Sequence, residues 1–212
     1  MFPRRPGPEA SCTIAKDCKI SQKDHEETFL DRTTRPDGPN SMQVASMKSF
    51  EVNRTESQGE FPLSHIFMGL EDSEVIQSLF GGRASATEIL QNLHVKLDDS
   101  AEYMYVNEAN GNVVVRGEYL RSASEKLLYL DIIHELVHVK QYREGRELFD
   151  SRFSYVDRPT ELEAYRITLD EARKIGMTEE EIEDYLYVEW ISKKEHKKLA
   201  KTLGVNDPRQ GR

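Results

Sequence analysis

Apolar residues are sparse and without pattern over residues 1–60, and a regular spacing of hydrophobic positions begins only near Phe61. The first stretch is rich in Pro, Ser, Thr, Asn and charged side chains, a composition that buries too little apolar surface to offset the entropy lost on folding. We therefore expect a mostly disordered leader over residues 1–60, a core over residues 61–177 and a helical extension packed on that core over residues 178–212.

Two short helices are expected at the start of the core. An acidic stretch at residues 71–73 precedes a run with helical spacing, and Gly81-Gly82 ends that run, because glycine readily adopts the left-handed conformation that closes a helix. A second helical pattern extends from Ser85 or Ala86 to Leu93. The two helices would lie directly before the strands of the core.

Three β-prone segments follow and predict a small antiparallel sheet. They cover residues 94–97, 103–106 and 113–119. Asn110-Gly111 lies between the last two segments, and this pair is typical of a tight hairpin turn. The last segment carries Gly117, where the missing side chain would let a substrate backbone approach closely, although a β-bulge explains this glycine equally well.

The longest helical pattern begins at Ser122 or Ser124 and runs to about Arg143, before Gly145. Leu, Ile and Val occupy most of its sides, so the pattern predicts a buried central helix. Further helices are expected after it, with starts and ends given by Pro, Gly and two capping boxes. They are a helix from Pro159 to Lys174, a helix after Thr178 that passes through Trp190, and a helix from Ser192 to Leu203.

The central helix contains the pentapeptide His134-Glu135-Leu136-Val137-His138. Histidines four residues apart leave a helix on the same face, so both imidazoles can bind one zinc ion while Glu135 stands beside the remaining position. A lone buried histidine is usually a hydrogen-bonded core residue. Two at ligand spacing with a carboxylate between them favour a metal site, since burying these groups without a metal or full hydrogen bonding is costly.

A catalytic zinc site requires a third protein ligand. The continuation HExxHxxGxxH would need Gly and His where this chain has Gln141 and Glu144, so Glu144 is a weak candidate. Better candidates are Glu161 and Glu163 in the first turn of the next helix. They lie about 200° apart around the helix axis, so only one of them can face the central helix.

HELVH followed by a loop and a helix carrying Glu161-x-x-Ala164 resembles the gluzincin branch of the zincin metallopeptidases, particularly the compact minigluzincins. The resemblance covers about residues 113–172. It implies that Glu161 is the third zinc ligand and that Ala164 lets the two helices approach closely. The residue after this Ala is commonly Asp or Asn and supports the ligands, but here it is Tyr165, so Asp131 or Asp157 is expected to orient the histidines instead.

The implied fold class is α+β and zincin-like, with a small antiparallel sheet packed on the buried HExxH helix and the following Glu-bearing helix. The implied activity is zinc-dependent hydrolysis of a peptide or protein substrate, with Glu135 as general base. Tyr155 or Tyr165 could donate a phenol hydrogen bond to the oxyanion, and Tyr142 is an equal alternative. Two other functions remain open: a zinc-bound latent or regulatory binding module without proteolysis, and a helical interaction protein without metal.

The net charge, the lack of long apolar runs and the cysteines indicate which partners and which cellular compartment to expect. A net charge of −9 argues against general nucleic-acid binding, which depends on Lys and Arg contacts to phosphates. No apolar run approaches the ~20 residues that span a bilayer, and no signal-peptide core is present, so we expect a cytoplasmic protein without membrane contact. The two cysteines, Cys12 and Cys18, are incidental thiols of the leader or could supply a thiolate to the metal in a latent form.

Overall fold

A computed structural model of the chain describes residues 47, 49–101 and 103–205. Cys12, Cys18 and most of the predicted leader lie outside these residues. The described end of the leader contributes a strand, β1, and the start of β2, so regular structure begins before the predicted position Phe61. The strands are β1 (Glu51–Val52), β2 (Gly59–Pro62), β3 (Phe67–Met68), β4 (His94–Leu97), β5 (Met104–Val106) and β6 (Val113–Val115).

Helices make up most of the described chain and confirm the mixed α+β class. The α-helices are α1 (Leu63–Ile66), α2 (Glu74–Phe80), α3 (Arg83–Asn92), α4 (Gly117–Ser122), α5 (Glu125–Arg143), α6 (Pro159–Lys174), α7 (Glu179–Tyr185) and α8 (Lys193–Thr202). Two 3₁₀ turns, η1 (Leu70–Asp72) and η2 (Tyr155–Asp157), precede α2 and α6. The two short helices predicted before the sheet are α2, which ends at Gly81 with φ 81°, and α3.

The main sheet has four strands in the order β2-β4-β6-β5, and a separate antiparallel pair joins β1 to β3. The predicted hairpin is confirmed, because β5 pairs with β6 antiparallel across the Asn110-Gly111 turn. The β2–β4 pairing is also antiparallel, whereas β4 and β6 run parallel. The prediction of an antiparallel sheet is therefore right for two pairings and wrong for the third. The chain passes from β4 to the far edge, forms β5 and returns between the two, which makes β6 parallel to β4.

Gly117 does not lie on the last strand, so its predicted role in admitting a substrate strand is wrong. Strand β6 ends at Val115, and Gly117 is the first residue of α4. A Cβ at this glycine would lie 2.9 Å from Asp99 Oδ1 and 3.0 Å from Arg121 Nη1. The glycine makes room for these side chains of the same chain.

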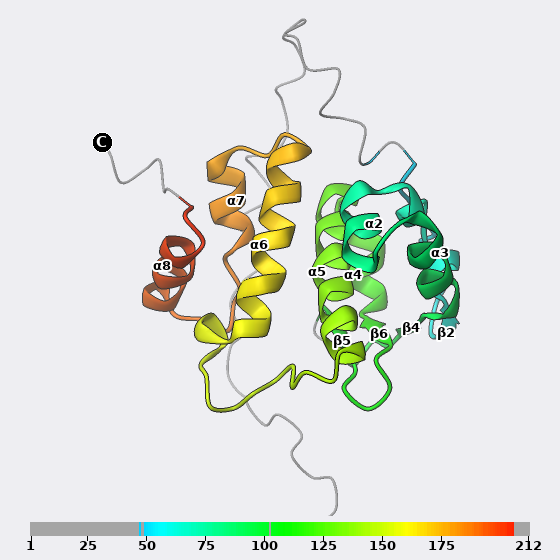
Figure 1. Cartoon of the computed structure of the whole chain (residues 1–212), viewed down its shortest axis with the longest axis horizontal. Coiled ribbons are helices and arrows are strands. Elements are labelled where there is room, and N and C mark those ends of the chain that lie inside the picture. Colours follow the sequence, from blue (N-terminus) through cyan, green and yellow to red (C-terminus); the bar gives the residue numbers. More distant parts are fainter. Residues whose placement is uncertain (1–46, 48, 102, 206–212) are drawn as a thin grey trace, which may run out of the picture. The chain divides into compact units, whose positions relative to one another are not determined.

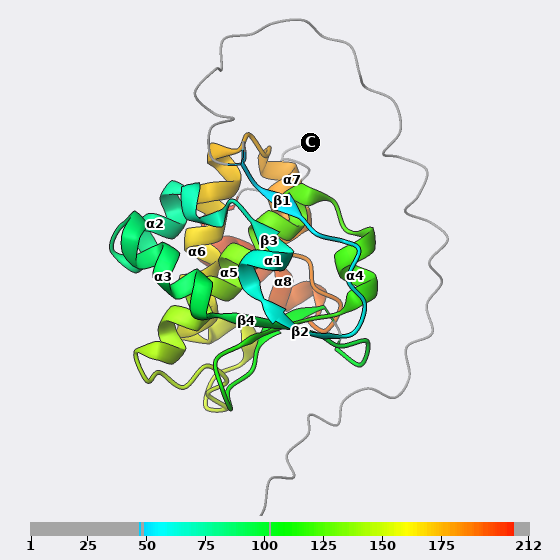
Figure 2. The same ribbon diagram turned by 90° about the vertical axis from the view of Figure 1, so that its right-hand side faces the viewer.

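Helix α5 is the buried central helix that the hydrophobic pattern predicts. The Ser124 side chain caps its start by accepting a hydrogen bond from Leu127 N at 3.3 Å. Its residues 132–139 are all buried, and it lies between the sheet, α2 and α6 (Figures 1 and 2). Helix α6 has the predicted bounds and packs along α5 (Figure 1). Ala164 is fully buried in α6 and adds little bulk to that helix surface.

The C-terminal region contains both predicted helices, and both capping boxes form. Helix α7 ends at Tyr185, so the prediction that it passes through Trp190 is wrong. Residues 186–191 turn instead toward α8, and the Trp190 side chain is 53% exposed. Within the described residues, no helix is both long enough and apolar enough to cross a membrane.

Candidate metal centre

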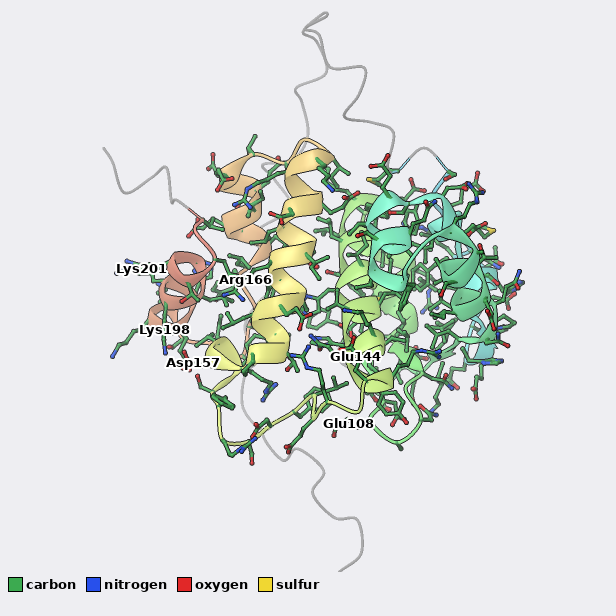
Figure 3. The ribbon with its side chains drawn as sticks, viewed as in Figure 1. Glu108, Glu144, Asp157, Arg166, Lys198 and Lys201 are labelled. Atoms are coloured by element: carbon green, nitrogen blue, oxygen red, sulfur yellow. The ribbon has the colours of Figure 1, made fainter. Side chains whose placement is uncertain are left out.

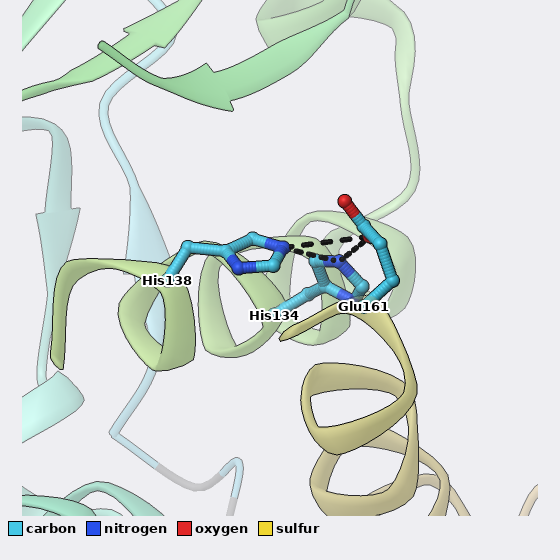
Figure 4. A group of neighbouring side chains, drawn as sticks. All are labelled: His134, His138 and Glu161. Atoms are coloured by element: carbon cyan, nitrogen blue, oxygen red, sulfur yellow. Dashed lines mark hydrogen bonds and ion pairs between the residues drawn. The ribbon is translucent and has the colours of Figure 1, made fainter. Parts of the chain in front are cut away.

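Three polar side chains from α5 and α6 converge between the two helices (Figure 4). His134 and His138 are one turn apart on α5, which directs both imidazoles to the same side of the helix. Glu161 comes from the first turn of α6. The two Nε2 atoms are 3.1 Å apart, and Glu161 Oε2 lies 3.4 Å from His134 Nε2 and 3.5 Å from His138 Nε2. All three residues are more than nine-tenths buried.

The donor set and its surroundings fit a divalent metal ion. Two imidazole nitrogens and one carboxylate oxygen are a known ligand set of catalytic zinc. The Nε2 atoms face each other and Glu161, and His134 Nδ1 is buried with no hydrogen-bond partner in the described part of the chain. Among the described residues this is the one group of three His, Cys, Asp or Glu side chains that could hold a metal. With both imidazoles neutral, a bound cation would be coordinated by the two Nε2 atoms and Glu161 Oε2 at once.

Comparison with models of protein families, with curated proteins and with solved structures gives no match. The interpretation of this cluster therefore rests on its residues and their geometry.

The pKa values of the two histidines shift in opposite directions. Burial lowers the pKa of His134 and the nearby His138 adds to this, although hydrogen bonding to Glu161 opposes the shift. Burial also disfavours the charge on His138, but hydrogen bonding to Glu161 and the charges of Glu135 and Glu161 raise its pKa to about 9. Burial works against the Glu161 charge, yet the two histidines hold the pKa of this carboxyl well below its usual range. Glu161 is therefore present as a carboxylate, the form that binds metal.

Glu135 lies beside the three candidate ligands and next to the edge strand β5. Its side chain is buried, and the Val106 backbone N–H donates a hydrogen bond to its carboxylate. Burial is the main reason why its pKa rises to about 8, with smaller contributions from the charges of Glu161 and Asp131. A carboxyl whose pKa lies near neutral pH can both accept and return a proton, which is the property required of a general base.

The structure separates Glu161 from the other candidates for third ligand. Glu163 lies against the end of α5, where it accepts hydrogen bonds from Gln141 and Arg146. Glu144 pairs with Lys140 at 3.4 Å near the end of α5, and its side chain is 46% exposed (Figure 3). Neither carboxylate belongs to the metal cluster, so these two alternatives are wrong. Glu161 is further held by Arg158, whose Nη1 lies 3.4 Å from Glu161 Oε1.

The two aspartates expected to orient the histidines do not contact them in the described structure. Asp131 accepts hydrogen bonds from Tyr119 and Tyr185. Asp157 pairs with Lys198 at the surface next to α8 (Figure 3). Both predictions are therefore wrong for hydrogen bonding, because nearby phenols and a lysine take up these carboxylates.

Two of the three candidate tyrosines lie at the cluster. The Tyr165 ring packs edge-on against the His134 ring with 4.7 Å between centroids, and the Tyr155 and Tyr165 hydroxyls are 2.8 Å apart. Burial raises the pKa of both phenols, so they stay protonated and able to donate. Tyr142 lies elsewhere, with its ring against Gly111 in the hairpin turn.

Sequence reasoning missed two residues that contact the candidate ligands. Gln141 Oε1 lies 2.7 Å from His138 Nδ1, and Arg158 pairs with Glu161. Both stand three residues from the ligand they contact, a spacing that brings side chains together on a helix. That spacing was the available signal for Gln141. Arg158 gave less signal, because it precedes Pro159 and lies just outside the predicted helix.

Proposed function

We propose that this protein is a zinc-dependent metallopeptidase of the zincin type, similar to the gluzincins, which hydrolyses peptide bonds in a peptide or protein substrate. The observation that supports it most is the convergence of His134 Nε2, His138 Nε2 and Glu161 Oε2 on one point, with the buried carboxyl of Glu135 alongside. These three residues would hold zinc, which when bound supplies Lewis-acid activation of water and of the substrate carbonyl.

Glu135 is the general base of the proposed reaction. It accepts a proton from the attacking water as the water oxygen bonds to the peptide carbonyl carbon. It then delivers that proton to the amide nitrogen as the C–N bond breaks, so the products are a carboxylate and an amine. The paired phenols of Tyr155 and Tyr165 lie near enough to the cluster to be the candidate donors to the oxyanion.

The position of strand β5 favours an extended peptide as the substrate. It is the edge strand of its sheet, and its Tyr105 pairs with Val114 of β6. Backbone hydrogen bonds from Arg116 N to Tyr103 O and from Asn107 N to Asn112 O flank that pair. Because an antiparallel strand alternates the direction of its backbone groups, those of Met104 and Val106 face the open edge. An added strand could pair there with Met104 and with the Val106 carbonyl, beside the Glu135 carboxyl to which Val106 N–H donates.

A comparison of three full-length proteins tests the proposal: wild type, Glu135→Gln, and Glu144→Gln as a matched control at the exposed end of α5. We expect wild type and Glu144→Gln to bind zinc and cleave casein. Glu135→Gln should keep zinc and lose about 10²- to 10⁴-fold in cleavage rate, the range attributed to general acid–base catalysis. Equal cleavage by wild type and Glu135→Gln contradicts the mechanism, and zinc binding without cleavage by wild type supports a regulatory zinc module instead.

A further inference from the structure

Gln141 bridges the two helices that supply the candidate ligands. It is 1% exposed, and its Oε1 atom lies 2.7 Å from Nδ1 of His138. On its other side, Nε2 donates to the backbone carbonyl of Thr160 at 3.1 Å and to Glu163 Oε2 at 3.0 Å. Thr160 directly precedes Glu161, so one buried amide contacts a ligand on α5 and the backbone next to the ligand on α6.

The hydrogen-bond partners fix the orientation of this amide. With Oε1 toward His138, the amide accepts one hydrogen bond and its NH₂ group donates to two oxygens. Turned over, it would present its oxygen to a carbonyl and a carboxylate, neither of which can donate. Because such buried mismatches are costly, the partners define which end of the amide faces the imidazole.

This orientation determines which nitrogen of His138 carries the proton. An amide oxygen only accepts, so Nδ1 of His138 must be the donor. In the neutral imidazole that binds metal, the lone pair of Nε2 is then directed toward His134 and Glu161, as metal coordination by that atom requires. The imidazole is thus held in one tautomer and one ring orientation by a neighbour on the same helix.

The other end of the amide holds the start of α6. The Thr160 carbonyl accepts from Gln141, while its hydroxyl donates to the carbonyl of Leu148 at 3.0 Å. Glu163 accepts from Gln141 and also pairs with Arg146 just after α5. Loss of the amide would therefore release both the His138 ring and the first turn of α6, which carries Glu161.

We propose that Gln141 is the positioning residue of the metal centre, fixing the His138 imidazole and holding the Glu161 turn against α5. This inference rests on the metal-binding part of the proposed function and does not depend on proteolysis. Gln141 would take the supporting role that the gluzincin resemblance gives to an Asp or Asn at the position of Tyr165.

The test compares zinc affinity in wild type, Gln141→Met and the control Gln77→Met. Methionine keeps the length of the side chain but removes the amide. Gln77 also makes a side-chain hydrogen bond, to Glu71 O at 2.9 Å, but lies on α2. Titration against a competing chelator should show ~10- to 100-fold weaker zinc binding for Gln141→Met, the range seen when partners of metal-ligand histidines are removed. Gln77→Met should bind zinc as wild type does.

Nitrogen-15 NMR of the zinc-loaded proteins gives a second measurement. We expect His138 to bind zinc through Nε2 and to show a Nδ1–H that exchanges slowly with water, whereas Gln141→Met should lose this slow exchange. Fast exchange in wild type, or equal zinc affinity in folded Gln141→Met, overturns the role of Gln141 while leaving the metal centre standing. Absence of zinc binding in wild type refutes the metal centre and this inference together.

Discussion

Two buried polar groups join α5 to α6, and they differ in how their polar atoms are arranged. In the first, Ser73, Tyr129 and Glu171 form a chain in which the Tyr129 hydroxyl lies 2.8 Å from Ser73 Oγ and donates to Glu171 Oε1 at 2.9 Å. Glu171 Oε2 lies 3.6 Å from Lys174 Nζ. Hydrogen-bond donors therefore meet acceptors along this chain. The second group is the His134, His138 and Glu161 cluster, where two imidazole nitrogens and a carboxylate oxygen face one another.

The difference separates a structural network from a ligand site. Buried polar groups are normally paired with complementary partners, and a group that lacks them costs free energy. In the Ser73–Tyr129–Glu171 chain, the hydroxyls and Glu171 Oε1 are hydrogen-bonded within the protein, while Glu171 Oε2 has no hydrogen-bond partner among the described residues and faces Lys174. In the metal cluster, two imidazole nitrogens and a carboxylate oxygen instead converge on one point. A cation at that point would be coordinated by all three of these atoms at once.

The largest expected effect is on stabilisation by zinc. Wild type at a free zinc concentration of 100 times its Kd should gain about 2.7 kcal/mol in the free energy of unfolding, because zinc binds only the folded site. His138→Ala should show almost none of this gain. Urea denaturation with zinc and with a chelator measures both, and an equal gain in the two proteins would mean that zinc binds elsewhere.

Tyr129→Phe should have a different effect on the same helix interface. Removing the hydroxyl leaves Ser73 and Glu171 without their shared partner, which we expect to lower the free energy of unfolding by about 1–3 kcal/mol. Zinc affinity should remain unchanged, because Tyr129 does not contact the metal cluster. A fall in zinc affinity as large as the loss of stability would show that the two polar groups are not independent.

The smallest effect is expected at the exposed end of the structural chain. Lys174 is 59% exposed and pairs with Glu171 at 3.6 Å. Ion pairs with an exposed partner contribute little, so Lys174→Gln should change the free energy of unfolding by less than about 1 kcal/mol. Denaturation at low and high salt checks this, and a larger, salt-dependent loss would give Lys174 a greater part in holding Glu171.

Local sequence signals predicted the longer helices and brought forward the three candidate ligands, but they did not predict the short helices α1 and α4. Ser124, Pro159 and Gly176 act through nearby backbone geometry, and the bounds of α5 and α6 follow from them. The spacing of His134 and His138 likewise depends only on helical periodicity. These features could be predicted because each depends on residues within a turn or two of the chain.

Features that depend on distant neighbours were harder to predict. The parallel β4–β6 pairing follows from strand order, which no local pattern encodes. Asp131 stands one turn before His134 as a supporting residue would, but Tyr119 and Tyr185 take up its carboxylate. Gln141 stands where the HExxHxxGxxH motif has a glycine, and its spacing from His138 already allowed the two side chains to contact each other.

Metal content is the most direct test of the central claim that His134, His138 and Glu161 hold a metal ion. Native mass spectrometry of the full chain after zinc loading and removal of excess metal should find about one zinc ion per wild-type chain. It should find almost none in a folded His138→Ala variant. Wild type without zinc, or both proteins with equal zinc, would contradict the claim.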